Sequence, residues 1–67
     1  MKTPLIEKLT EYRIESGLSY DKLGERTGIS SSTICRWYKG QGVPSLDEIE
    51  MLCEAMGHDI SDIFVTI

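Results

Sequence analysis

Residues 30–39 read SSSTICRWYK, and their spacing would give a helix two different faces. At about 100° per residue, one arc carries small and basic side chains, namely Ser31, Ser32, Cys35, Arg36 and Lys39. The opposite arc carries Thr33, Ile34, Trp37 and Tyr38, which can pack inward. Small residues allow close approach and the two cations attract phosphate, so the outer arc suits the major groove of DNA. A polar face that is merely solvated has the same pattern, so the rest of the chain must decide.

Size and composition bound the elements that could position this helix. A chain of 67 residues is a single domain, spanning 1–67, and buries only about 60% of its unfolded surface. Its 40% hydrophobic content is too high for a disordered chain, and its longest apolar run is too short to span a bilayer. Because the first residues lack the apolar core of a signal peptide, we expect a cytoplasmic protein with no membrane partner.

Cysteine and histidine are too sparse for a disulfide framework or a zinc site. Cys35 and Cys53 fall in different predicted helices, and His58 is the single histidine. We therefore expect reduced thiols, no metal and no cofactor. Cys53 should be buried and inert, Cys35 a small side chain of the outer arc, and His58 a half-buried packing residue. The absence of paired carboxylates, a Ser-His-Asp pattern and a phosphate loop argues against an enzyme and against a small-molecule ligand.

Charge is segregated along the chain. The net charge of −4 disfavours binding to a polyanion such as DNA. Residues 18–43 nevertheless hold four basic side chains against two acidic ones, a net charge of +2. Residues 44–67 hold six carboxylates and no Lys or Arg. The acidic end need not face DNA, and it is either a solvated surface or a surface for a protein partner.

Capping residues predict three short helices in the first part of the chain. Thr3 caps a first helix over residues 4–16. Ser19 caps a second helix of about two turns, which ends at Gly28. A third helix, over about 31–39, follows across this tight glycine turn. Two short helices joined in this way form a helix-turn-helix, in which they cross steeply.

Two further helices are predicted in the acidic part of the chain. Ser45 and Glu48 form a capping box that begins a fourth helix, and Gly57 ends it. The inner face of this helix is expected to carry Leu46, Ile49, Leu52, Cys53 and Met56. A last short helix runs to about Phe64 and leaves residues 65–67 as an apolar tail.

This succession of elements resembles the phage-repressor and Cro-like helix-turn-helix family, the XRE type, over nearly the whole chain. The residues that carry the resemblance are Arg13, Gly17, Leu18, Ser19, Leu23, Gly28, Ile29, Ser30, Thr33, Ile34, Gly40, Pro44, Ser45, Leu46 and residues 52–57. The resemblance implies an all-α fold, a compact five-helix lambda-repressor-like domain whose second and third helices form the helix-turn-helix. It also implies sequence-specific binding of double-stranded DNA by a small transcriptional regulator, a repressor, through the major groove.

The resemblance also implies which residues meet DNA. Base edges would be contacted by Ser31, Ser32 and Arg36, with Cys35 alongside. Phosphates would be contacted by Ser19, Tyr20, Lys39 and Gln41. Arg36 is the strongest reader, because a guanidinium can bind guanine through two hydrogen bonds for about 1 to 3 kcal/mol of discrimination.

Three positions depart from the family pattern. Tyr20 replaces the usual glutamine at the start of the second helix, and Gly24 replaces an alanine, which allows closer helix packing. Tyr38 replaces the glutamate that commonly pairs with the arginine of the first helix, here Arg13. Either Tyr38 offers Arg13 its ring face or hydroxyl, or Arg13 extends to water, and the sequence leaves both open.

The apolar C-terminal end suggests self-association. Ile63, Phe64, Val65 and Ile67 exceed what a frayed terminus needs. A homodimer on two half-sites would also supply the specificity that one helix-turn-helix lacks. The alternative function is a protein-interaction module that keeps the fold but does not bind DNA and uses its acidic C-terminal face.

Overall fold

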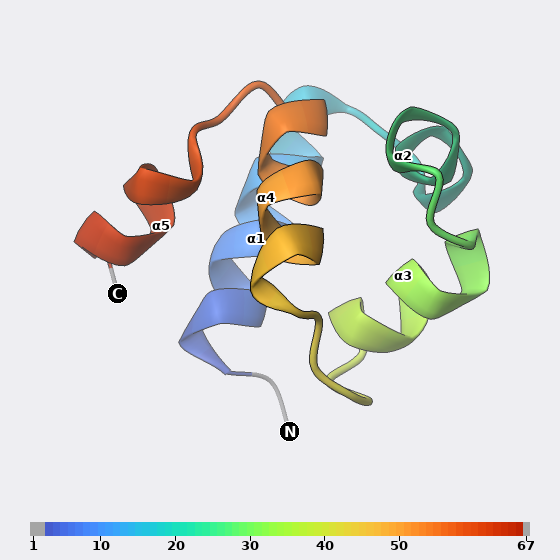
Figure 1. The fold of residues 1–67 in the computed structure, drawn as a ribbon, viewed down its shortest axis with the longest axis horizontal. Coiled ribbons are helices and arrows are strands. Elements are labelled where there is room, and N and C mark those ends of the chain that lie inside the picture. Colours follow the sequence, from blue (N-terminus) through green and yellow to red (C-terminus); the bar gives the residue numbers. More distant parts are fainter. Residues whose placement is uncertain (1–2, 67) are drawn as a thin grey trace.

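The protein folds into five short helices (Figure 1). The computed structural model describes residues 3–66, with side chains described up to Phe64. The helices are α1 (Pro4–Ser16), α2 (Tyr20–Thr27), α3 (Ser31–Tyr38), α4 (Leu46–Ala55) and α5 (Ile60–Thr66). No strand occurs in the described range. The expected all-α, five-helix class is confirmed.

The predicted capping residues begin the helices where they were expected. The Oγ1 of Thr3 accepts the N–H of Ile6 at 3.2 Å. The Oγ of Ser19 accepts the N–H of Lys22, also at 3.2 Å. At Ser45 the capping box is complete, because side chain and backbone bond reciprocally with residue 48. These local hydrogen bonds satisfy N–H groups that a helix leaves unpaired at its start.

Most helix ends lie where the sequence predicts them, since α1 and α2 end directly before Gly17 and Gly28. α3 ends at Tyr38, with Lys39 as its C-cap. α4 ends at Ala55 with Met56 as its C-cap, and Gly57 terminates it as predicted. Gly57 has a left-handed backbone (φ 81°), and the N–H groups of Gly57 and His58 bond back to the carbonyls of Glu54 and Cys53. α5 continues to Thr66 and takes in two residues that were expected in the tail.

One core joins all five helices. The buried apolar residues are Ile6, Leu9, Tyr12, Leu23, Ile34, Trp37, Tyr38, Ile49, Leu52, Cys53, Met56 and Ile63. Leu46 is an exception to the predicted inner face of α4, because its side chain is 60% exposed. It is the first residue of the helix, at the edge of the domain, and the four other residues of that predicted face are buried.

The α2–turn–α3 unit packs closely through a glycine. A Cβ atom added at Gly24 would lie 2.9 Å from the carbonyl oxygen of Ile29 in the turn. The missing side chain therefore lets α2 approach the turn, as expected for this departure from the family pattern. In Figure 1, α2 and α3 lie on one side of α4 and α5 lies on the other. No helix within residues 3–66 is both long and apolar enough to cross a bilayer.

Candidate nucleic-acid interface

Helix α3 has the two faces that its sequence predicts. Ile34, Trp37 and Tyr38 are buried in the core, which confirms a structural role for Trp37. On the outer face, Ser32, Arg36 and Lys39 are exposed, and Ser31 and Cys35 are half-buried. The helix is therefore fixed through one face and presents small and basic side chains on the other.

The basic side chains of the middle segment differ in their partners. Lys22 pairs with Glu25 at 3.2 Å, and Arg26 donates from Nη1 to the carbonyl oxygen of Ala55 at 3.0 Å. That carbonyl belongs to the last residue of α4, whose negative helix end attracts a cation. Arg36 and Lys39, in contrast, form no ion pair with any residue of the described range. The cations of this segment that have neither an ion pair nor a side-chain hydrogen bond with the described residues therefore lie on or directly after α3.

The serines at the start of α3 are bonded to each other. The hydroxyl oxygens of Ser30 and Ser32 are 2.9 Å apart, and either can donate. Ser30, the N-cap, makes no side-chain hydrogen bond to the helix backbone. The pair retains acceptor sites, since each hydroxyl has two lone pairs. Ser32 can therefore still bind a polar group that approaches this end of the helix.

The predicted phosphate-contacting residues form two groups in the sequence, one at the start of α2 and one directly after α3. Ser19 is exposed, and because its Oγ only accepts the N–H of Lys22, its hydroxyl proton is free to be donated. Lys39 and Gln41 are exposed at the other end of the helix-turn-helix, where the backbone N–H of Gln41 bonds the carbonyl of Arg36 at 2.8 Å. Tyr20 lies beside Ser19 but is half-buried.

Arg13 contacts tyrosine rings. Its Cζ lies 4.7 Å from the ring centre of Tyr20 and 5.6 Å from that of Tyr38. The Tyr38 hydroxyl does not serve Arg13, because it donates to the carbonyl oxygen of Leu9 at 3.2 Å and approaches the sulfur of Met56 at 3.6 Å. Tyr38 therefore offers Arg13 its ring face and not its hydroxyl. The closer contact with Tyr20 was missed, because it depends on the path of the α1–α2 loop.

Burial raises the pKa of two ionisable groups in the core. Burial raises the pKa of Tyr38, although the nearby Arg13 charge opposes the shift. Burial, with a smaller effect from Asp62, raises the pKa of the Cys53 thiol to about 11. Cys53 is fully buried and Cys35 only partly so. The neutral, buried Cys53 agrees with the expected inert thiol.

His58 packs against Tyr12 of α1. Its ring stacks on Tyr12 with centroids 3.6 Å apart and planes 8° apart, so the expected half-buried packing role is confirmed. The carboxylates of Glu15 and Asp62 lie 4.0 and 3.9 Å from its two ring nitrogens. Within residues 3–66, no three His, Cys, Asp or Glu side chains gather in a way that could hold a metal ion.

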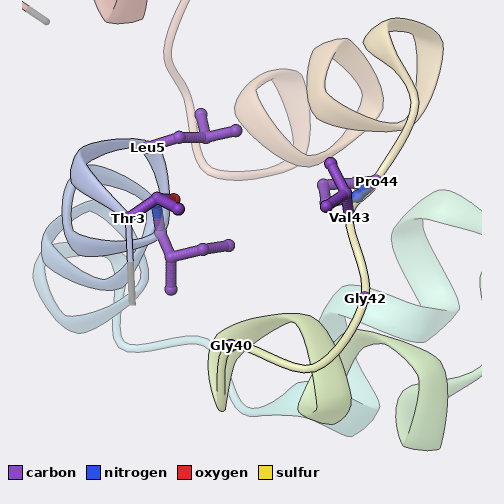
Figure 2. Close-up of a pocket in the computed structure, with 7 residues that line it drawn as sticks. Thr3, Leu5, Gly40, Gly42, Val43 and Pro44 are labelled. Carbon is purple, nitrogen blue, oxygen red and sulfur yellow. The ribbon is translucent and has the colours of Figure 1, made fainter. Parts of the chain in front are cut away.

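An apolar groove lies beside the loop that follows α3. It has a volume of about 370 Å³ and separates the start of α1 from residues 40–44. Figure 2 shows Leu5 on one wall, facing Val43 and Pro44 on the other. Val43 is 83% exposed. No pattern in the sequence predicts this groove, because its walls come from segments about 35 positions apart that the fold brings together.

The predicted dimerisation residues do not share one surface. Ile63 is fully buried in the core, so its expected place at a dimer interface is incorrect. Phe64, the next residue, is 60% exposed. The side chains of Val65 and Ile67 lie outside the described part of the structure. The turn of α5 explains the contrast, because neighbouring helical residues point about 100° apart.

Comparison with known proteins agrees with this geometry. The Cro/C1-type HTH DNA-binding domain matches residues 8–67. An uncharacterised HTH-type transcriptional regulator of Bacillus subtilis is 37% identical over 57 residues, covering 85% of this chain and 86% of that protein. Another, from Methanothermobacter thermautotrophicus, is 38% identical over 58 residues, covering 85% and 84%. No solved structure gives a significant match. Together with the two-faced α3 and the glycine turn before it, these matches show that the chain belongs to the Cro/C1-type helix-turn-helix family of DNA-binding transcriptional regulators.

Proposed function

We propose that the protein binds a specific double-stranded DNA sequence by placing α3 and the adjoining Lys39 in the major groove. The observation that carries this proposal is the pairing of a buried inner face with two exposed cations, Arg36 and Lys39, that form no ion pair with the described residues. Arg36, Ser31, Ser32 and Cys35 contact base edges. Arg36 provides most of the discrimination, because hydroxyls and a thiol distinguish bases weakly.

Phosphate contacts on both sides of α3 hold the helix in register. Ser19 and Tyr20 contact the backbone of DNA at the start of α2, and Lys39 and Gln41 contact it beyond the end of α3. Such contacts fix the position of a protein on the duplex without reading its sequence. The exposure of three of these four side chains supports the assignment, and Tyr20 contributes at most its phenol group.

Regulation in this proposal is repression by a homodimer in the cytoplasm. A bound domain excludes other proteins from the DNA that it covers, which is sufficient for a repressor. Two copies reading two half-sites compensate for the small reading surface of one copy. The exposed Phe64, followed by Val65 and Ile67, provides the apolar contact between copies.

Selection from random duplex DNA at two salt concentrations tests this proposal. A preferred sequence should emerge, and log K should fall with log salt with a slope of about −0.9 per neutralised phosphate. Arg36→Ala should lose about 1 to 3 kcal/mol of discrimination at one base pair. Lys8→Ala, which removes a cation of α1 that pairs with Glu11, is the matched control and should bind as the wild type does.

Failure to bind any duplex at either salt concentration would overturn DNA binding. The rival function would then be favoured by capture of a stoichiometric protein partner that survives nuclease treatment. The acidic side chains of α4, Asp47, Glu50 and Glu54, are exposed and form no ion pair with the described residues, so they are the surface to mutate in that case.

A further inference from the structure

Arg13 contacts three parts of the fold at once. It lies on α1, and its Nη1 donates to the carbonyl oxygen of Leu18 in the α1–α2 loop at 3.2 Å. Its guanidinium lies over the rings of Tyr20 and Tyr38, which are themselves 5.5 Å apart. Tyr20 is the first residue of α2 and Tyr38 is the last residue of α3. One side chain of α1 therefore connects the two outer ends of the helix-turn-helix.

The shape of the guanidinium, as well as its charge, maintains these contacts. Arg13 forms no ion pair with a carboxylate of the described residues, and its buried Nε has no hydrogen-bond partner among them. The guanidinium is held by one hydrogen bond to a carbonyl oxygen and by contacts with two aromatic rings. A planar guanidinium can stack on a ring while its edge donates a hydrogen bond, whereas a lysine ammonium cannot do both. Lysine at this position would keep the charge and lose the geometry.

The two ends that Arg13 connects are next to the proposed phosphate contacts. Ser19 directly precedes Tyr20, and Lys39 directly follows Tyr38. We propose that Arg13 is a positioning residue for DNA binding, which fixes the spacing of the two phosphate-contacting ends without touching DNA. The inference rests on the proposed function, and it adds to it a determinant of affinity inside the domain.

Binding measurements with three variants test the proposal. Arg13→Lys keeps the charge, Arg13→Met removes it, and Lys8→Met removes a charge from the same helix at a residue whose recorded contacts, with Glu11 and Tyr12, stay on α1. Each variant is measured at a temperature where its unfolding curve shows it to be folded. Both Arg13 variants should bind the selected duplex about tenfold more weakly, the equivalent of one lost charge-assisted hydrogen bond. Their salt slopes should fall in magnitude by about 0.9, the value for one phosphate, while Lys8→Met changes neither quantity. Arg13→Lys binding with wild-type affinity would overturn the proposal.

Amide hydrogen exchange without DNA tests the positioning independently. The N–H of Leu23 bonds Ser19 at the start of α2, and the N–H of Lys39 bonds Cys35 at the end of α3. In Arg13→Lys both amides should exchange faster than in the wild type, and in Lys8→Met neither should. Unchanged exchange at both would overturn the positioning role. A wild-type protein that binds no duplex would instead overturn the proposed function, and the exchange result would still decide whether Arg13 holds the two ends.

Discussion

Tyr38 combines a ring that faces Arg13 with a hydroxyl that bonds inside the core. The hydroxyl donates to the carbonyl oxygen of Leu9, so it connects α3 to α1 in a fully buried place. Tyr38→Phe keeps the ring and removes this bond. We expect the free energy of unfolding to fall by about 1 kcal/mol, the usual net value of a hydrogen bond, in a urea titration.

Tyr12 offers the control for that change. It is also a buried tyrosine, but its hydroxyl makes no hydrogen bond with any residue of the described part of the chain, and its ring stacks on His58. Tyr12→Phe should therefore change the urea midpoint much less than Tyr38→Phe does. Equal effects of the two substitutions would mean that the Leu9 bond contributes nothing of its own.

The two thiols should differ in reactivity. Cys35 is partly exposed, whereas Cys53 is fully buried and the pKa of its thiol is raised to about 11 by that burial. Because the thiolate is the reactive form, a thiol reagent at pH 8 should modify Cys35 in the folded protein and Cys53 only after unfolding. Cys35→Ser should abolish the early reaction and leave the late one. Rapid modification of both thiols in native protein would contradict this assignment.

The Cys53 thiol makes the free energy of unfolding depend on pH. The folded state raises the pKa of Cys53 above its ordinary value of 9.0, so it holds the proton more tightly than the unfolded chain does. The stabilising contribution is therefore complete below about pH 9 and is lost as the pH rises toward 11. The pKa values of Tyr12 and Tyr38 are raised as well, which acts in the same direction at higher pH.

The sequence predicted side-chain environments well where helical periodicity alone decides them. The division of α3 into a core face with Trp37 and an outer face with Arg36 follows from about 100° per residue, and the structure has it. Leu46 and Ile63 were misplaced, because their burial depends on where each helix meets the rest of the domain. The contact of Tyr20 with Arg13 likewise depends on a loop path that no periodicity describes.

At the scale of the helix, Ser45 and Ser30 differ in the hydrogen bonds with which they cap α4 and α3. Ser45 caps α4 with a complete capping box, whereas Ser30 caps α3 with no side-chain hydrogen bond to the helix backbone. Ser45→Ala should lower the free energy of unfolding by about 1 kcal/mol. Ser30→Ala, the matched substitution, should have a much smaller effect in the same thermal or urea unfolding experiment. A larger loss at Ser30 would show that the recorded cap geometry does not control these helices.

The helix starts were predictable because they depend on near neighbours. Thr3, Ser19 and Ser45 each bond an N–H three residues ahead, so the signal lies within one turn of sequence. The glycines that end α1, α2 and α4 were predictable for the same reason, because each lies directly at the helix end that it terminates. The end of α5 at Thr66, where no glycine or proline stops the helix, was not predicted.

At the scale of the whole molecule, the net charge of −4 is compatible with DNA binding because of where the charges lie. The exposed cations Arg36 and Lys39 belong to the α3 region, while α4 and α5 carry exposed carboxylates and no Lys or Arg. α1 and α2 carry charges of both signs. A polyanion is attracted to the first surface and repelled by the second. The sequence predicted this segregation by segment, and in Figure 1 α5 lies on the opposite side of α4 from α3. The acidic surface can thus remain solvated, and because DNA repels it, it can also turn the α3 side of the domain toward DNA.

Dimerisation is the whole-molecule property that the proposed function most needs. Phe64 is 60% exposed on α5, and an exposed aromatic side chain favours an apolar partner surface. Phe64→Ser should shift sedimentation toward the monomer and weaken binding to a two-half-site duplex much more than binding to one half-site. Ile14→Ser is the control, because Ile14 is similarly exposed, at 67%, but lies on α1. If α5 forms the dimer contact, Phe64→Ser should affect sedimentation and DNA binding and Ile14→Ser should not. Equal effects of the two substitutions would indicate non-specific association.

A wild-type protein that is a strict monomer, both free and on DNA, would exclude the homodimer, and specificity would then rest on α3 and the DNA shape that it reads.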